Sequence, residues 1–242
     1  MIKGYLFDYG GTLDTAGCHW GKMLWHAYER QAVPVTETQF REAYVYAERL
    51  LGREPLIRPD YTFHKTLAVK IRLEMEQLCI SGAWDADEEA FNAKHTAVLE
   101  DLYAAVKTIT AHSAAVLARL SAQCPMVLVS NFYGNIRTVL AEFGLDRYFI
   151  DVIESAEVGL RKPDVRIFER GVARLGLPPE AVCVVGDSFY KDIEPAAKLG
   201  CRTVWFSGEG WTDKRYDETL PDRIITDLEQ LLTMPGDTPP QR

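Results

Sequence analysis

The chain has 242 residues, of which 47% are hydrophobic, and this is enough apolar material to bury a full core. Its 27 basic and 35 acidic residues give a net charge of −8 at pH 7, and the basic residues are scattered along the chain. A nucleic-acid partner is therefore not expected, because such binding needs a concentrated basic surface. The longest apolar runs, such as 126–129, are too short to span a bilayer, and no signal-like segment opens the chain. We expect a globular, cytoplasmic protein with no membrane partner, whose oligomeric state stays open.

The cysteine pattern gives no sign of a disulfide framework or a zinc site. There are five cysteines, an odd number, and no two of them form a C-x-x-C pair. We expect reduced thiols, most of them buried, as is common for free cysteine.

The N-terminal part of the chain changes from a strand pattern to a helical one. Segment 2–8 is a short apolar run that ends at the glycine pair 10–11, which is typical of a buried strand leading into a loop. From about 20 to 78, apolar residues recur at helical spacing. Within this region Thr36 and Gln39 have the spacing of a capping box, which predicts the start of a helix.

From residue 126 onward, strand-like runs alternate with helical ones. Strands are expected at 126–130, 149–154, 181–186 and 202–206, and helices near 134–143, 165–175 and 190–199. This order predicts an α/β fold, a doubly wound, Rossmann-like parallel sheet with helices on both faces. In such sheets, ligands bind at the carboxyl ends of the strands.

The helical region lies between the first and second predicted strands, so we expect it to be an inserted cap domain. Its last helical stretch is expected at about 87–106. The predicted division is a helical cap at 17–95 and an α/β core made of 1–16 and 96–234. The Pro-rich tail at 235–242 is expected to be disordered.

Polar residues follow the predicted strands, at the edge of the sheet where ligands bind. Asp8, Ser130, Lys162 and Asp187 each suit one task in phosphoryl transfer. A carboxylate such as Asp8 can attack phosphorus and form an aspartyl-phosphate. Two facing carboxylates, Asp8 and Asp187, need a hard cation such as Mg²⁺ between them. The hydroxyl of Ser130 and the ammonium of Lys162 offset the charge on the phosphoryl oxygens.

The motifs, in this order, resemble those of the haloacid dehalogenase-like (HAD) hydrolase superfamily, in its helical-cap branch (C1, subfamily I). The resemblance covers most of the chain and is carried by Asp-x-Gly-Gly-Thr at 8–12, Ser-Asn at 130–131, Arg-Lys-Pro at 161–163 and Gly-Asp-Ser-x-x-x-Asp at 186–192. It implies a Mg²⁺-dependent phosphatase acting on a small phosphorylated metabolite under a helical cap.

The resemblance also implies residue roles. Asp8 is expected to be both nucleophile and metal ligand, joined by the backbone carbonyl of Gly10 and the carboxylate of Asp187. Asp192 is expected to orient a metal-bound water or the catalytic Lys162. The residues expected to contact the phosphoryl group are Tyr9, Gly10, Ser130, Asn131 and Lys162.

One position departs from the family pattern. Gly10 stands where the family carries a second aspartate, which acts as general acid and base, and losing such a group costs about 10²- to 10⁴-fold in rate. We hypothesise that His19, at the start of the first cap helix, projects toward Gly10 and replaces this group. The alternative is a helix-start residue packed beside Trp20. Asp14 is expected to be a solvated turn residue that points toward the cap.

Three functions remain open at this point. The leading one is a Mg²⁺-dependent phosphatase, which is slow if nothing replaces the acid missing at Gly10. The second is a weakly active or inactive member that binds a phospholigand or a protein partner. The third is a dehalogenase or phosphonate-cleaving enzyme, and Asp187 and Asp192 argue against dehalogenation because that reaction needs no metal.

Overall fold

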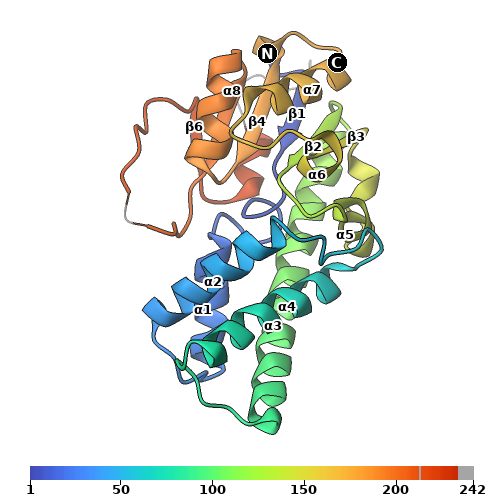
Figure 1. The fold of residues 1–242 in the computed structure, drawn as a ribbon. Helices are drawn as coiled ribbons and strands as arrows, with labels where there is room; N and C mark the ends of the chain where they lie inside the picture. Colours follow the sequence, from blue (N-terminus) through green and yellow to red (C-terminus); the bar gives the residue numbers. More distant parts are fainter. Residues whose placement is uncertain (213, 234–242) are drawn as a thin grey trace.

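The computed structural model describes residues 1–212 and 214–233. Figure 1 shows an α/β core at the top and a group of helices below it, joined by one long helix that runs through both parts. The tail expected to be disordered, 235–242, lies outside the described residues.

The core is a parallel sheet, as the sequence predicts. Its strands in the described part of the chain are β1 (Gly4–Phe7), β2 (Met126–Ser130), β3 (Asp151–Glu154), β4 (Val182–Gly186), β5 (Arg202–Phe206) and β6 (Arg223–Ile225). Their order is β3-β2-β1-β4-β5-β6, and every neighbouring pair is parallel. The five expected strands are confirmed as β1 to β5, whereas β6 was not expected, because its three residues at the sheet edge form no recognisable apolar run.

Both faces of the sheet are buried at its centre, which explains why β1, β2 and β4 are nearly continuous apolar runs rather than alternating ones. Leu6 of β1 belongs to one apolar cluster together with Val127 and Val184 of the neighbouring strands. Tyr5 and Phe7, which point to the opposite face, belong to a second and larger cluster that continues into the cap. The expected doubly wound α/β core is therefore confirmed.

The helices follow the sequence pattern closely in the first part of the chain. The cap side is built from α1 (Trp20–Arg30), α2 (Glu37–Leu51), α3 (Phe63–Ile80) and α4 (Glu88–Ser121). The capping box of Thr36 and Gln39 is present at the start of α2. The helix expected to end near 106 continues to Ser121, because no glycine or proline interrupts 107–121. The proposed domain boundary at residue 95 thus lies inside α4, and the division into core and cap stays a prediction.

Shorter helices complete the core. They are α5 (Ile136–Glu142), α6 (Ser155–Val158), α7 (Val165–Leu175) and α8 (Glu194–Leu199), and α8 follows a π-helical turn at Phe189–Ile193. None of the five cysteines, all of which lie among the described residues, forms a disulfide bond. Among the described residues, no helix is both long and apolar enough to cross a bilayer.

Helix α7 lies close against the sheet, and this contact depends on one glycine. A Cβ atom at Gly171 would lie 3.0 Å from side-chain atoms of Leu6 and of Val129. That distance is shorter than ordinary van der Waals contact, so even a small side chain must displace its neighbours. The absence of a side chain at Gly171 allows α7 to cover β1 and β2.

We expect Gly171→Val to lower the free energy of unfolding by about 1–3 kcal/mol, because overpacking a tight core displaces backbone and side chains. Chemical denaturation followed by circular dichroism measures this change. Ala173→Val is the matched control, since Ala173 is exposed on the same helix and reports only the helix propensity of valine. Equal losses in the two variants would show that the close contact is unimportant.

Candidate active site

Parallel pairing places two aspartates side by side at the carboxyl ends of the central strands. Asp8 follows β1, Asp187 follows β4, and Phe7 pairs with Val185 across the two strands. The Asp8 backbone N–H extends the pairing by donating to the carbonyl of Val185 at 3.0 Å. Asp8 is buried and Asp187 is half-buried. The register of two neighbouring strands thus brings together carboxylates that are 179 positions apart in the chain.

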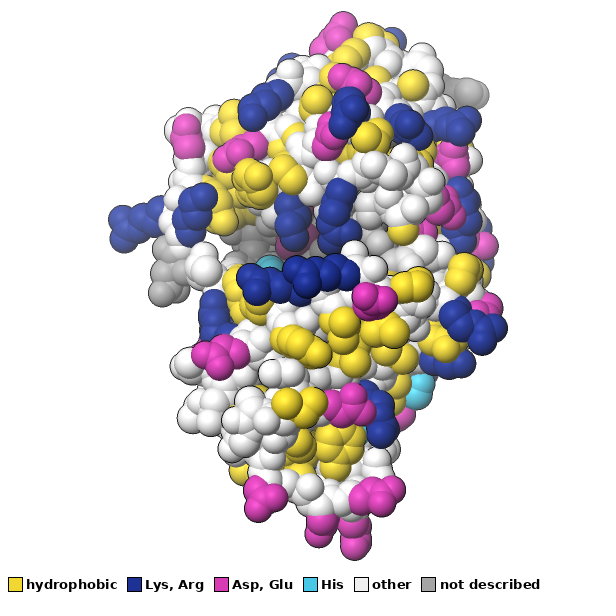
Figure 2. Space-filling model, viewed as in Figure 1, with side chains coloured by type: hydrophobic (Ala, Val, Ile, Leu, Met, Phe, Trp, Pro, Cys, Tyr) yellow, Lys and Arg dark blue, Asp and Glu magenta, His cyan; other side chains and the backbone are white. Residues whose placement is uncertain are grey.

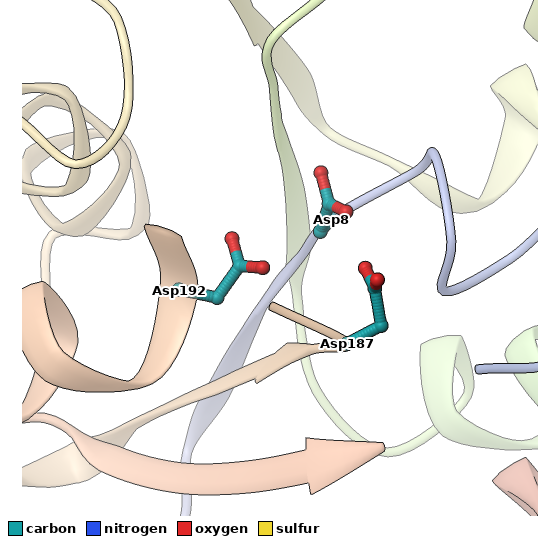
Figure 3. A group of neighbouring side chains, drawn as sticks. All are labelled: Asp8, Asp187 and Asp192. Atoms are coloured by element: carbon teal, nitrogen blue, oxygen red, sulfur yellow. The ribbon is translucent and has the colours of Figure 1, made fainter. Parts of the chain in front are cut away.

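A third carboxylate, Asp192, completes an acidic cluster. Figure 3 shows Asp8, Asp187 and Asp192 directed toward a common space, Asp192 from a helical turn and the other two from strand ends. One oxygen from each of the three lies within 4.8 Å of the others. Asp192 is fixed in place because its second oxygen accepts the backbone N–H of Ser188 at 3.1 Å.

Lys162 is the buried cation of this cluster. Its ammonium donates to Asp8 at 2.5 Å and to Asp192 at 2.7 Å. Asn131, which follows β2, holds the Lys162 backbone from both sides: its Oδ1 accepts the Lys162 N–H at 2.9 Å and its Nδ2 donates to the Lys162 carbonyl at 3.0 Å. The peptide bond between Lys162 and Pro163 is cis. Asn131 therefore positions Lys162 in this structure.

Thr12 links the two strand-end aspartates, a role that the sequence interpretation did not assign. Its hydroxyl accepts the backbone N–H of Asp187 at 3.0 Å and lies 3.2 Å from the Asp187 carboxylate and 3.4 Å from that of Asp8. Gly11 makes room beside it: its φ is +102°, and a Cβ atom there would collide with the Asp187 carboxylate. The signal in the sequence is the Gly-Thr pair after Asp8, since both residues are needed for close approach of the loop to Asp187.

The charges of the cluster do not balance. Burial raises the pKa of Asp187 well above its usual value, and the neighbouring charges of Asp8 and Asp192 raise it further. Burial also raises the pKa of Asp192 to about 6, against the opposing effect of Lys162. Burial lowers the pKa of Lys162, but Asp192 and Asp8 outweigh this effect, so the pKa is raised overall and the ammonium stays charged.

Three carboxylates that face one ammonium fit a divalent cation. Hard oxygen ligands are those that Mg²⁺ prefers, and it binds through one or two carboxylates together with waters and substrate phosphate. Asp8 and Asp187 supply such oxygens, and Gly10, whose carbonyl the sequence predicts as a ligand, lines the same cavity. The donor set therefore has the right chemistry for this ion.

Ser130 and Tyr9 each carry a buried hydroxyl without a hydrogen-bond partner among the described residues. Leaving such a group unpaired costs about 1–3 kcal/mol, so each is a candidate for a bond to a molecule outside the chain. Ser130 is the last residue of β2, which pairs with β1 directly before Asp8. The Tyr9 ring packs edge-on against the ring of Phe132, with the two centroids 5.7 Å apart.

The space beside Gly10 is filled by an indole ring. A Cβ atom at Gly10 would lie 3.7 Å from Nε1 of Trp20, so the indole occupies the surroundings of the side chain that glycine lacks. That indole N–H donates to Asp14 at 3.0 Å, and the other Asp14 oxygen accepts the Gly11 N–H at 2.8 Å. Gly10, Trp20 and Asp14 thus form one unit that joins the first motif to the cap.

Asp14 is completely buried, so the expectation of a solvated turn residue was wrong. The loop after Asp8 turns back on itself, with the Leu13 N–H donating to the Tyr9 carbonyl at 2.8 Å, and this directs Asp14 inward. Burial raises the pKa of Asp14 to about 8, and the nearby charge of Asp8 contributes. Asp14 therefore carries a proton at neutral pH, and it lines the cavity.

His19 lies at the start of α1 and also lines the cavity. Its Nδ1 accepts the Gly21 N–H at 3.0 Å, and its ring stacks on Trp211 with centroids 5.1 Å apart. Burial lowers the pKa of His19 to about 4, and the charges of Lys191 and Lys70 contribute. The imidazole is therefore neutral at pH 7 and holds no extra proton to donate. His19 thus resembles the alternative given for it, a residue at the start of a helix, but its ring packs on Trp211 rather than beside Trp20.

The cavity that contains these residues has a volume of about 370 Å³ and lies between core and cap. Its rim carries two exposed cations, Arg161 and Lys191. Figure 2 shows Lys and Arg side chains gathered on this face at the level where core and cap meet. The cap wall carries Glu48 and Lys70, which the sequence interpretation missed because polar residues on amphipathic helices are usually solvated.

Sequence comparison decides the family. A sequence model of haloacid dehalogenase-like hydrolases matches residues 2–200. The chain belongs to this family. A family member solved with magnesium bound, a putative HAD-hydrolase of Bacillus subtilis, matches the fold with a TM-score of 0.58 at 20% identity, covering 95% of this chain and 96% of the other. At that identity the likeness concerns the fold alone.

Two relatives with named activities match a shorter part of the chain. A glyceraldehyde 3-phosphate phosphatase of Methanocaldococcus jannaschii is 40% identical over 93 residues, which are 38% of this chain and 40% of that protein. A phosphoserine phosphatase of Thermus thermophilus is 35% identical over 95 residues, 39% of this chain and 37% of that protein. The chain thus spans about two fifths of the length of the curated relatives it matches.

Behind the cap wall, Glu74 is a buried carboxyl group that lies near Lys70. Its Oε2 accepts the hydroxyl of Tyr28 at 3.2 Å, while its Oε1 has no partner among the described residues. Burial raises the pKa of Glu74 to about 8, against the opposing effect of Lys70. The folded protein therefore binds a proton at Glu74 that the unfolded chain has already released near pH 4.5.

This difference makes the stability pH-dependent. Proton binding at Glu74 contributes to the free energy of unfolding, because the folded state binds the proton more tightly than the unfolded chain. This contribution is fully present below about pH 4.5 and is lost as the pH rises through 8. We expect Glu74→Gln to remove this loss. The free energy of unfolding of the variant minus that of wild type should therefore increase by at least about 1 kcal/mol between pH 5 and pH 8. Urea unfolding at both pH values measures it, with Glu76→Gln on the same helix as control. A pH-independent difference would contradict the burial of Glu74 in its protonated form.

Proposed function

We propose that the chain is a Mg²⁺-dependent phosphatase that acts on a small phosphorylated metabolite through an aspartyl-phosphate on Asp8. The observation that carries the proposal is the convergence of Asp8, Asp187 and Lys162 on one space at the strand ends, in the wall of a cavity between core and cap. A cavity of about 370 Å³ suits a small molecule better than a protein chain. The printed activities of the two named relatives, both phosphatases of small metabolites, support the same reaction class.

The chain's own residues suit the two steps of such a reaction. Lys162 holds one carboxylate oxygen of Asp8, which leaves the other oxygen to attack phosphorus and displace the leaving oxygen. The Lys162 ammonium and the unpaired Ser130 hydroxyl are placed to offset the charge that spreads over the phosphoryl oxygens. Water then cleaves the aspartyl-phosphate, which regenerates Asp8 and releases inorganic phosphate.

Mg²⁺ would be held by Asp8, Asp187 and the Gly10 carbonyl, with Asp192 beside them and already bonded to Lys162. When bound, the ion supplies positive charge that stabilises the transferring phosphoryl group. Asp192 and Lys162 fix each other, and Thr12 fixes Asp187, so the oxygens are preorganised by contacts within the chain.

The leaving oxygen needs a proton, and two side chains on the cavity wall are candidates to supply it. His19 remains a candidate by position, but its lowered pKa leaves it without a proton at neutral pH. Asp14 carries a proton there, and it lies behind the indole next to Gly10. Asp14 is thus the better acid of the two, although the Trp20 indole, and not Asp14, fills the space directly beside Gly10.

The second candidate function is that of a weakly active member that binds phospholigands or partners. It is favoured by one observation, the occupation of the space beside Gly10 by Trp20, which keeps a direct acid out. Dehalogenation and phosphonate cleavage are the remaining alternatives. The acidic cluster counts against dehalogenation, because it fits a metal ion and the attack of a carboxylate on carbon needs none.

We expect the protein to release phosphate from phosphorylated metabolites and from an aryl phosphate, and to lose at least about 100-fold in rate when EDTA removes Mg²⁺. Asp8→Asn should lower the rate by at least about 10³-fold, since the nucleophile is gone. Asp146→Asn, on an exposed aspartate of the core, is the control. Binding of vanadate or phosphate without any hydrolysis would instead support the second candidate function.

The proton donor is tested by two variants compared on an alkyl phosphate, whose leaving group needs protonation. We expect Asp14→Asn to lower kcat at least about tenfold, and His19→Ala to lower it less than about threefold, because only Asp14 holds a proton at neutral pH. A tenfold or larger loss in His19→Ala with little change in Asp14→Asn would reverse the assignment. Thermal unfolding of both variants checks that the loop remains folded.

A further inference from the structure

The cap side of the cavity carries an ion pair outside the catalytic cluster, formed by a buried lysine and a half-buried glutamate. The Lys70 ammonium on α3 lies 2.6 Å from Oε1 of Glu48 on α2, and both residues line the cavity. Lys70 is only 7% exposed. The hydroxyl of Tyr133, a core residue, donates to the same Glu48 oxygen at 3.0 Å. Two helices of the cap and one segment of the core therefore fix the pair in position.

The ion pair has hydrogen-bonding capacity left over. An ammonium has three N–H donors, and among the described residues Glu48 is the only acceptor that Lys70 contacts. The rings of Tyr44 and Trp20 also lie close to it, with centroids 4.8 Å and 5.7 Å from the ammonium. The second Glu48 oxygen, Oε2, has no hydrogen bond to a described residue. The pair thus offers a donor and an acceptor, next to each other, on the cavity wall.

The charge of the pair selects against charged ligand groups. Lys70 and Glu48 together are neutral, and the buried Glu74 lies one turn further along α3 from Lys70. A ligand carboxylate that reached Lys70 would also meet the negative charge of Glu48, and a ligand ammonium would meet Lys70, both in a site of low dielectric. A neutral hydroxyl group accepts from Lys70 and donates to Glu48 at once. Hydroxyl is therefore the group that this wall complements.

Aromatic rings line the cavity on the same side. Trp20, Tyr44 and Phe63 come from the cap, and Trp211, from the segment after β5, packs against Tyr44. Such rings pack against the C–H faces of polyols and sugars while polar groups bond their hydroxyls, and this combination orients a ligand within an otherwise apolar pocket. The wall therefore suits a molecule with both C–H and hydroxyl groups.

We propose that Lys70 and Glu48 form a hydroxyl-binding subsite that selects phosphate esters of polyols or sugars over esters that carry a carboxylate. The proposal rests on the proposed phosphatase function, because it concerns the part of the substrate that leaves after phosphoryl transfer. The two residues are specificity determinants on the cap, across the cavity from the reacting oxygen of Asp8.

Two matched esters test the selectivity of the wild-type enzyme. Glycerol 3-phosphate and 3-phosphoglycerate differ in one terminal group, a hydroxymethyl in the first and a carboxylate in the second. We expect kcat/KM to be at least about tenfold higher for glycerol 3-phosphate. Equal values or a preference for 3-phosphoglycerate would overturn the subsite while leaving the phosphatase function intact. Failure to hydrolyse these esters and an aryl phosphate alike would instead remove the proposed function itself.

Variants of the pair separate a binding role from a structural one. Glu48→Gln leaves the wall with a net positive charge, so the ratio of kcat/KM for 3-phosphoglycerate to that for glycerol 3-phosphate should rise at least about fivefold. Loss of packing alone would lower both values together, and that outcome would also overturn the proposal.

The double variant Lys70→Met with Glu48→Gln removes both charges, so neither is left buried without its partner. Here KM for glycerol 3-phosphate should rise at least about tenfold while kcat changes less than about threefold. Lys65→Met is the control, since Lys65 is exposed on the same helix and does not line the cavity. An unchanged KM in the folded double variant would contradict the subsite.

Discussion

The placement of one buried ammonium among three carboxylates, two of which it contacts, is the arrangement on which the whole site depends. Lys162 contacts Asp8 and Asp192 directly, and the register of β1 against β4 brings Asp187 to the same space. Charges taken out of water cost several kcal/mol each unless they are paired, so this excess of negative charge is a strained arrangement that favours a bound cation. Asn131 holds the backbone of Lys162 and keeps its ammonium in place.

The loop after Asp8 connects this cluster to the cap. In place of the aspartate that the family carries, Gly10 leaves room for the indole of Trp20, which begins the first cap helix and donates to Asp14. Asp14 in turn accepts the Gly11 N–H, so the conformation of the catalytic loop and the position of α1 depend on each other. A cap movement that displaced Trp20 would therefore also disturb the loop that carries the nucleophile.

Much of the fold was predictable because its signals are local. The run Met126–Val129 is apolar and buried, as expected for a strand covered on both faces, and the predicted segments 126–130 and 202–206 became β2 and β5 with those bounds. The end of α4 and the short strand β6 were not predictable in the same way. No residue in 107–121 stops a helix, and three residues at a sheet edge have no periodic pattern.

The sequence by itself determined the family motifs, the order of strands and helices, and the set of residues at the strand ends, because each rests on spacing along the chain. Only the tertiary structure decided which polar side chains are buried. Asp14 and Lys70 look like solvated residues in the sequence, yet the folded loop encloses the first and the packing of α2, α3 and the core encloses the second. The burial of a single polar group depends on contacts between segments that are distant in the chain, and the local periodicity of the sequence does not predict these contacts.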